Sequence, residues 1–310
     1  MRKIRDYLVL HIREDFNARA YGALAMFLIA SMAFNYITDF EDSYLDTLPD
    51  LSRLLAYFGW HILAYFTPIV ILFYTGRHRA LLNRDLYIRA LLALFLLSLD
   101  RALPYAHKLI AQTAHPQSQY WWIKIAHNVS GVMLMVIPLL IYYAVADRTQ
   151  GHFYGLRPQR FDARPYFIML LIMMPVLLLA STLPGFQAQY PMYEKTAAAS
   201  YWNVPEWFAA LVYEVAYGIN FIGIEFFYRG FLVLGMAHLL GRSSVLAMSV
   251  LYCFLHFGKP LPEAISSIFG GYILGVIALE TKSIWGGIIV HIGIAWMMEL
   301  IGALHKFNII

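Results

Sequence analysis

The stretch that decides the fold is GINFIGIEFFYRGFLVLGM, residues 218–236, which holds one acid, Glu225, and one base, Arg229. Nearly every other residue in it is apolar, aromatic or glycine. A charged group at bilayer depth is costly unless it is paired, so such groups are rare and are functional candidates. Residues four apart share one face of a helix, so the two charges can neutralise each other. The stretch predicts a membrane helix whose ion pair is either part of a functional site or a structural salt bridge.

The composition of the whole chain supports this prediction. Of its 310 residues, 60% are hydrophobic and only 14% are charged, and the mean hydropathy is +0.59. Soluble domains contain about 25% charged residues, so we expect an integral membrane protein. The net charge of +4 is expected to lie in cytoplasmic loops and to contact membrane lipids, and no nucleic-acid partner is expected.

Nine apolar segments are long enough to span or nearly span a bilayer, for which a helix needs roughly 20 residues. They cover approximately residues 20–38, 54–75, 86–103, 124–146, 166–185, 205–236, 243–257, 263–280 and 284–304. The third and the seventh are short, and either can tilt or reach only part of the way. The sequence therefore predicts an all-α, polytopic transmembrane helix bundle with eight or nine spans.

The basic residues of the connections indicate the orientation. They concentrate in the N-terminal arm (Arg2, Lys3, Arg5, Arg13 and Arg19), in the second connection (Arg77, Arg79 and Arg84) and in the fourth (Arg148, Arg157, Arg160 and Arg164). The connections between these carry a single base each: Arg53, Lys108 or Lys195. By the positive-inside rule the N-terminus is cytoplasmic. The side of the C-terminus depends on whether one short segment is re-entrant.

The ionisable groups are unevenly distributed along the chain. We expect a cytoplasmic amphipathic arm over residues 1–19, membrane helices over 20–200, and a core over 201–310 that holds most of the intramembrane ionisable groups. Four groups in this core are the main candidates: Glu225, Arg229, His256 and His291. A single histidine in an apolar helix is more often a hydrogen-bonded packing residue. However, at 1.5 Å per residue Glu225, His256 and His291 lie roughly 12–20 Å from the cytoplasmic ends of three helices. This common depth predicts one shared site.

One glutamate and two histidines allow two kinds of chemistry. A carboxylate and an imidazole can activate water and protonate a leaving amine. Alternatively, Glu225, His256 and His291 can bind zinc with an open fourth position. The H-E-x-x-H helix of many zinc proteases is missing from the sequence, so we favour a site without a cofactor over a zinc site.

Three further carboxylates are candidates for the same interior. Glu214 precedes Glu225 by eleven residues, which returns to nearly the same helix face, although it is also placed to mark the outer interface. Glu299 follows His291 by eight residues. Glu263 begins a helix and is also placed to pair with Lys259. They are kept as possible additional catalytic residues.

These residues resemble the motifs of the CAAX protease and bacteriocin-processing family, called CPBP or Abi. The family is marked by E-E-x-x-x-R, F-x-x-x-H and H-x-x-x-N in this order. Here IEFFYR supplies Glu225 and Arg229, YCFLH supplies His256 with Tyr252 at the usual phenylalanine, and SIWGGIIVHIGIA supplies His291. The resemblance covers residues 205–300 and implies an intramembrane peptidase of the prokaryotic cytoplasmic membrane. Its implied substrate is a hydrophobic or membrane-anchored peptide.

Two positions depart from the family pattern. Ile224 stands at the first glutamate, which in the family is taken to activate water, and Ala295 stands at the asparagine, which would steady the oxyanion. The leading hypothesis is a peptidase in which Glu225 and His256 activate water and His291 polarises the scissile carbonyl. The alternative is an inactive relative that binds a membrane peptide or partner, and a third hypothesis is a proton-relay transporter.

Overall fold

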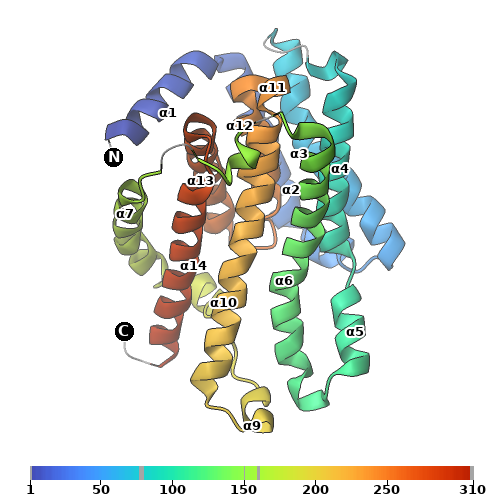
Figure 1. Ribbon diagram of the computed structural model, residues 1–310, viewed down its shortest axis with the longest axis vertical. Helices are drawn as coiled ribbons and strands as arrows, with labels where there is room; N and C mark the ends of the chain where they lie inside the picture. The colour runs from blue at the N-terminus through green and yellow to red at the C-terminus, as the bar shows by residue number, and fades with distance from the viewer. Residues whose placement is uncertain (1, 77–79, 150, 159–160, 308–310) are drawn as a thin grey trace. The chain divides into compact units, whose positions relative to one another are not determined.

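The computed structural model describes residues 2–76, 80–149, 151–158 and 161–307, and this part of the chain is helical and contains no strand. The α-helices are α1 (Arg2–Asp15), α2 (Ala18–Thr38), α3 (Asp50–Tyr74), α4 (Arg84–Ala102), α5 (Tyr105–Thr113), α6 (Pro116–Tyr142), α7 (Arg164–Ala180), α8 (Pro184–Gln189), α9 (Ala198–Trp202), α10 (Glu206–Glu225), α11 (Ala237–Leu240), α12 (Ser244–Phe254), α13 (Leu261–Thr281) and α14 (Trp285–Lys306) (Figure 1). Three π-helices, η1 (Phe40–Leu45), η3 (Tyr143–Asp147) and η5 (Phe226–Gly235), and three 3-10 turns, η2 (Ala80–Leu82), η4 (Phe153–Gly155) and η6 (Gly241–Ser243), complete the order. The predicted all-α fold is confirmed.

Each of the nine apolar segments contains a helix. In the described residues, six continuous stretches are long and apolar enough to cross a membrane: 18–38, 50–74, 116–147, 206–254, 261–281 and 285–306. The fourth of these joins two of the predicted segments. The 11 residues of α12 make about 16 Å of helix, roughly half of the hydrocarbon core, as expected for a short segment. Arg77, Arg79 and Arg160, which entered the orientation argument, lie outside the described residues.

The chain forms two compact units that interleave along the sequence. Unit 1 contains residues 1–103, 138–161 and 226–286, and unit 2 contains residues 104–137, 162–225 and 287–310. These units are compact groups of residues and do not test the division that was expected near residue 200. That division stays a prediction.

Three buried charged side chains of unit 1, Arg89, Asp147 and Glu41, take part in ion pairs. Arg89 on α4 contacts Asp85 at 2.6 Å and Asp147 at 2.5 Å, and Arg101 contacts Glu41 at 2.8 Å. Buried charges are stable only when they are paired and hydrogen-bonded. These pairs connect α4 to η1 and η3, which are far from each other in the sequence.

Glycines allow two helices of unit 1 to pack closely. A Cβ on Gly271 of α13 would lie 3.2 Å from the ring of Tyr252 on α12, and one on Gly275 would lie 2.8 Å from the Met248 side chain. Small residues four apart on one helix face let helix backbones approach. This contact positions α12, which leads into His256.

Unit 2 contains α10, nearly all of α14, all of α7, and the part of α6 that precedes residue 138. A Cβ on Gly218 of α10 would lie 3.0 Å from the Trp296 ring of α14, and the Trp296 indole donates a hydrogen bond to the Glu214 carbonyl at 3.1 Å. On α6, the Trp121 indole donates to the Ala209 carbonyl at 3.2 Å. These contacts hold the helices that carry Glu225 and His291.

Candidate functional site

Glu225 and His291 form a hydrogen-bonded pair in unit 2. Glu225 is the last residue of α10 and is fully buried, and its Oε1 lies 3.0 Å from Nδ1 of His291 on α14. The ring of Phe221, one turn before Glu225, lies 4.4 Å from the His291 ring, centroid to centroid. A hydrogen bond between a carboxyl group and a ring nitrogen fixes the orientation of the imidazole.

Gly287 makes room for this pair. It lies on α14 one turn before His291, and a Cβ at this position would overlap the Glu225 carboxylate. The carboxylate therefore occupies the space that any side chain at position 287 would need. Gly287 was not among the predicted site residues, although a glycine four positions before a motif histidine was a signal for it.

Ile224 and Ala295, the two departures from the family pattern, belong to one apolar cluster of unit 2. Ala295 is 4% exposed and packs with Tyr213, Tyr217 and Phe221, and Ile224 packs against the same cluster. The positions at which the family has a carboxylate and an amide are therefore neighbours of the same aromatic side chains. In this chain they supply hydrocarbon and no hydrogen-bonding side chain.

Glu214 on α10 and Glu299 on α14 lie close together in unit 2 and form a second pair of carboxyl groups. Glu299 also accepts the backbone N–H groups of Met192 at 2.7 Å and Tyr193 at 3.2 Å. Eleven residues separate Glu214 from Glu225, about 16 Å along a helix, so this second pair lies at another depth of the same two helices.

Arg229 and His256 lie in unit 1, where Tyr252 contacts both. Arg229 is 1% exposed in the π-helix η5, and its guanidinium lies over the Tyr252 ring, 4.6 Å from the centroid. The rings of Tyr252 and His256 are 4.6 Å apart, and the His256 Nδ1 donates to the Tyr252 carbonyl at 2.8 Å. This bond places the lone pair of the imidazole on Nε2. Tyr252 at the usual phenylalanine of the motif therefore packs against the motif arginine.

Two residues of α2 hold the turn that carries His256. The Tyr36 hydroxyl donates to the Lys259 carbonyl at 2.6 Å and approaches the His256 carbonyl at 3.4 Å, and the Asn35 amide donates to the Phe257 carbonyl at 3.2 Å. Asn35 is buried at 3% exposure. Neither residue was predicted, because hydrogen bonds to carbonyls more than 200 positions away leave no local signal.

A second long-range support lies under η5. Tyr154 of η4 is fully buried, has a φ of +48°, and places its carbonyl 2.8 Å from where a Cβ on Gly230 would lie. Its hydroxyl donates to Asp147 at 2.5 Å, and Asp147 is the partner of Arg89. A left-handed φ at a bulky residue persists only where the surroundings hold it. The buried ring and ion pair are those surroundings.

The remaining candidate, Glu263, lies 3.9 Å from Lys259, one turn away on the same stretch. This is the ion-pair alternative that the sequence offered for Glu263. It lies in unit 1, whereas Glu214 and Glu299 lie in unit 2.

The candidate residues are thus divided between the two units: Glu225 and His291 in unit 2, Arg229 and His256 in unit 1. The predicted convergence of Glu225, His256 and His291, and the predicted pairing of Glu225 with Arg229, stay predictions. Across residues 2–76, 80–149, 151–158 and 161–307, no group of three or more His, Cys, Asp or Glu side chains is arranged to hold a metal ion. The zinc set likewise stays a prediction.

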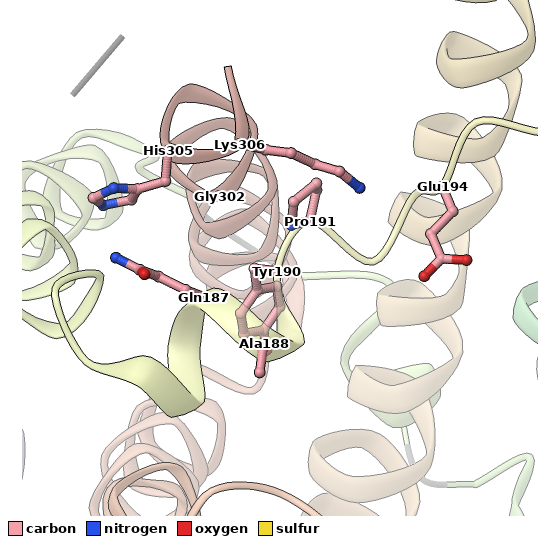
Figure 2. Close-up of a pocket in the computed structure, with 8 residues that line it drawn as sticks. All are labelled: Gln187, Ala188, Tyr190, Pro191, Glu194, Gly302, His305 and Lys306. Carbon is pink, nitrogen blue, oxygen red and sulfur yellow. The ribbon is translucent and has the colours of Figure 1, made fainter. Parts of the chain in front are cut away.

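A pocket of about 320 Å³ opens elsewhere in unit 2 (Figure 2). It is lined by Gln187, Ala188, Tyr190, Pro191, Glu194, Gly302, His305 and Lys306. Figure 2 shows His305 and Gln187 on one side of it and Glu194 on the other. No motif residue lines this pocket, so it is distinct from the predicted site.

The fold and the buried polar pairs define an integral membrane protein of polytopic all-α type, with ionisable groups held at depth in its C-terminal third. Residues 205–297 match the family model described as Rce1-like, type II CAAX prenyl endopeptidase Rce1-like. The match confirms the resemblance to CAAX proteases over somewhat less than a third of the chain, and it includes all three motifs. Neither the curated proteins nor the solved structures gave a match.

Proposed function

We propose that this protein hydrolyses a peptide bond within or next to the bilayer of a prokaryotic cytoplasmic membrane. The observation that carries the proposal is the match of residues 205–297 to CAAX endopeptidases, because it includes Glu225, Arg229, His256 and His291. The hydrogen bond between Glu225 and His291 supports it, since a catalytic imidazole is commonly oriented by a carboxylate.

The proposed mechanism assigns a proton to each step. His256 accepts a proton from water at Nε2 as the water oxygen attacks the scissile carbonyl, and then returns that proton to the leaving amine. Glu225 shares in the activation of this water and orients the His291 ring through their hydrogen bond, and His291 polarises the scissile carbonyl. Arg229, whose guanidinium lies over the Tyr252 ring, keeps the role that the sequence predicts: it pairs with Glu225 and orients it. No cofactor takes part.

The proposed substrate class follows from the location of the site in the membrane. A site on helices that cross the membrane is reached most readily by a hydrophobic or lipid-anchored peptide, and the surrounding partners are membrane lipids. We test this with the full-length protein in nanodiscs and a fluorogenic peptide that carries a prenyl anchor. We expect the anchored peptide to be cleaved and the same peptide without the anchor to be cleaved much more slowly.

The residues are tested by alanine substitution under the same conditions. We expect His256→Ala and Glu225→Ala each to lower kcat by at least about 100-fold, the usual contribution of a positioned acid or base. His107→Ala, a histidine outside the matched region, is the matched control and should retain activity. Cleavage unchanged by both His256→Ala and Glu225→Ala would reject the mechanism.

A specific observation favours a second function, the binding of a membrane peptide without cleavage. The cluster of Ile224 and Ala295 replaces two polar positions of the family by hydrocarbon. A binding protein predicts that the prenylated peptide is retained but stays intact over long incubation. Ile224→Glu combined with Ala295→Asn would then create cleavage that the wild-type protein lacks, whereas an active wild-type enzyme excludes this second function.

The proton-relay transporter uses the same groups and stays a prediction. It predicts proton-coupled flux in liposomes that Glu225→Gln abolishes.

A further inference from the structure

The first helix, α1, buries two polar side chains and Ile4 against the rest of unit 1 and exposes several of its apolar side chains. His11 and Asp15 are buried, at 0% and 4% exposure. Its exposed apolar side chains are Val9, Leu10 and Ile12, at 49%, 41% and 45%, and Phe16, directly after the helix, is 51% exposed. A helix on the surface of a soluble protein shows the opposite pattern. The outward face of α1 is therefore suited to contact an apolar environment as well as water.

Ionic contacts fix which face of α1 points inward. The Arg242 guanidinium contacts Glu14 at 2.5 Å and also pairs with Glu280, and the Ser243 hydroxyl donates to Asp15 at 2.9 Å. Two of the three acidic residues of α1 are thus directed to unit 1. The bases Lys3, Arg5 and Arg13 are exposed, so the outward face carries a surplus of positive charge.

The position of α1 along the membrane helices places this face at a bilayer boundary. α1 is followed after two residues by α2, and it packs against η6, which leads into α12, and against α13, which ends at Thr281. In unit 1 it lies at the same end as α11 (Figure 1). Since the ends of several apolar helices meet here, α1 lies where hydrocarbon gives way to headgroups.

The outward face has the chemistry of a headgroup site. Arg5, Asp6, Val9, Leu10 and Arg13 line an open hollow on it. Arg5, Val9 and Arg13 are spaced four apart, which places an apolar side chain between two guanidiniums on one helix stripe. Guanidinium groups match phosphate oxygens with paired hydrogen bonds. Asp6 contacts Arg5 at 3.1 Å, but both are highly exposed, and such a pair contributes little.

We propose that the outward face of α1 is a binding surface for anionic phospholipids of the leaflet that it contacts. Arg5 and Arg13 bind the phosphate of the headgroup, and Val9, Leu10 and Ile12 contact the upper acyl chains. The inward ionic contacts keep this face directed at the lipid. The inference is independent of the proposed peptidase activity.

The test uses the full-length protein in nanodiscs of phosphatidylcholine with increasing phosphatidylglycerol. An environment-sensitive fluorophore is attached at Ile12→Cys in a Cys253→Ala background, since Cys253 is the only native cysteine. We expect a blue shift that saturates with phosphatidylglycerol. Arg5→Gln with Arg13→Gln should weaken this apparent affinity by about 25-fold, because each base near an anionic surface contributes about 1 kcal/mol and 1.4 kcal/mol is tenfold.

Two controls separate a lipid site from a general charge effect. Lys195→Gln with Lys306→Gln removes the same charge from exposed positions in unit 2 and should leave the titration unchanged. Asp6→Asn removes a negative charge from the outward face and should tighten binding several-fold. The proposal is overturned if phosphatidylglycerol causes no more shift than phosphatidylcholine, or if the Lys195 and Lys306 pair weakens binding as much as the arginine pair does.

Discussion

The two units hold their motif residues in different ways. In unit 2, Glu225 and His291 are held by their own helices: α10 and α14 supply the pair, the Phe221 ring beside it and the glycine that makes room for it. In unit 1, Arg229 and His256 depend on α2 and on the η3–η4 segment, far outside the matched residues 205–297.

The matched residues 205–297 include the structural support of one motif pair but not that of the other. The unit 2 pair is complete within helices that the family model recognises. The unit 1 residues are oriented by Asn35, Tyr36 and Tyr154, which the family model does not cover. Substitutions of Asn35, Tyr36 or Tyr154 should therefore disturb the unit 1 motifs and leave the Glu225–His291 pair intact.

The largest expected effect is from breaking the buried ion pair below η5. Asp147→Ala leaves the Arg89 guanidinium with Asp85 alone and removes the acceptor of the Tyr154 hydroxyl. Removing one partner of a buried ion pair costs about 3–5 kcal/mol. Reversible unfolding in mixed micelles measures the change. Asp6→Ala, which breaks the exposed pair with Arg5, is the control and should cost at most about 1 kcal/mol. Equal losses in both variants would contradict the role of Asp147.

The next effect is a pH dependence in unit 1. Burial raises the pKa of Glu41 from 4.5 to about 7, while Arg101 lowers it in part. Between these values the folded protein holds a proton that the unfolded chain has lost, so stability is fully present below pH 4.5 and falls as pH rises towards 7. The shift corresponds to roughly 3 kcal/mol. In Glu41→Gln the free energy of unfolding should change little between pH 4.5 and 7.5. In Glu194→Gln, an exposed substitution in unit 2, its pH dependence should be that of the wild-type protein. If the free energy of unfolding still fell with rising pH in Glu41→Gln, another group would be the cause of the pH dependence.

Gly287→Ala tests the packing of the Glu225–His291 pair in unit 2. The added Cβ would overlap the Glu225 carboxylate, and overpacking of this kind costs about 1–3 kcal/mol. Gly270→Ala on α13 is the matched control, because nothing lies within 4 Å of its Cβ position and alanine is the better helix former. It should be neutral or stabilising.

A double-mutant cycle then shows whether Glu225 is the cause. Gly287→Ala should cost much less in a Glu225→Ala background, because the carboxylate that it would displace is then missing. If the losses in the free energy of unfolding were additive, the Cβ at position 287 would not overlap the Glu225 carboxylate.

The fold class was predictable from the sequence because it depends on composition and on apolar segment length. Each of the nine apolar segments contains an α-helix, since a chain in hydrocarbon must satisfy its backbone hydrogen bonds internally. The breaks within them were not predictable: residues 205–236 read as one helix, but η5 within them is π-helical. A π-helix needs packing partners such as Tyr154 under Gly230, which the local sequence does not encode.

The candidate site was predictable only as a set of residues. Motif spacing identified Glu225, Arg229, His256 and His291, and helix periodicity related Glu214 to Glu225. The partners in space were not predictable, because the hydrogen bond of Glu299 to Met192 and that of Tyr36 to Lys259 join residues more than 100 positions apart. Such contacts are set by tertiary packing, for which a single sequence has no periodic signal.

The smallest expected effect tests the support of His256 by α2. Tyr36→Phe removes the hydroxyl that bonds the Lys259 carbonyl at 2.6 Å and should lower the free energy of unfolding by about 1 kcal/mol. It should also shift the NMR signals of the His256 ring, because the turn that carries this histidine loses a hydrogen bond. Tyr74→Phe, at a tyrosine that is 81% exposed in the same unit, is the control and should change neither. The signals of His291 in unit 2 should stay in place in both variants. A shift of the His291 signals equal to that of His256 would refute the difference between the units, because it would show that the α2 contact supports both histidines alike.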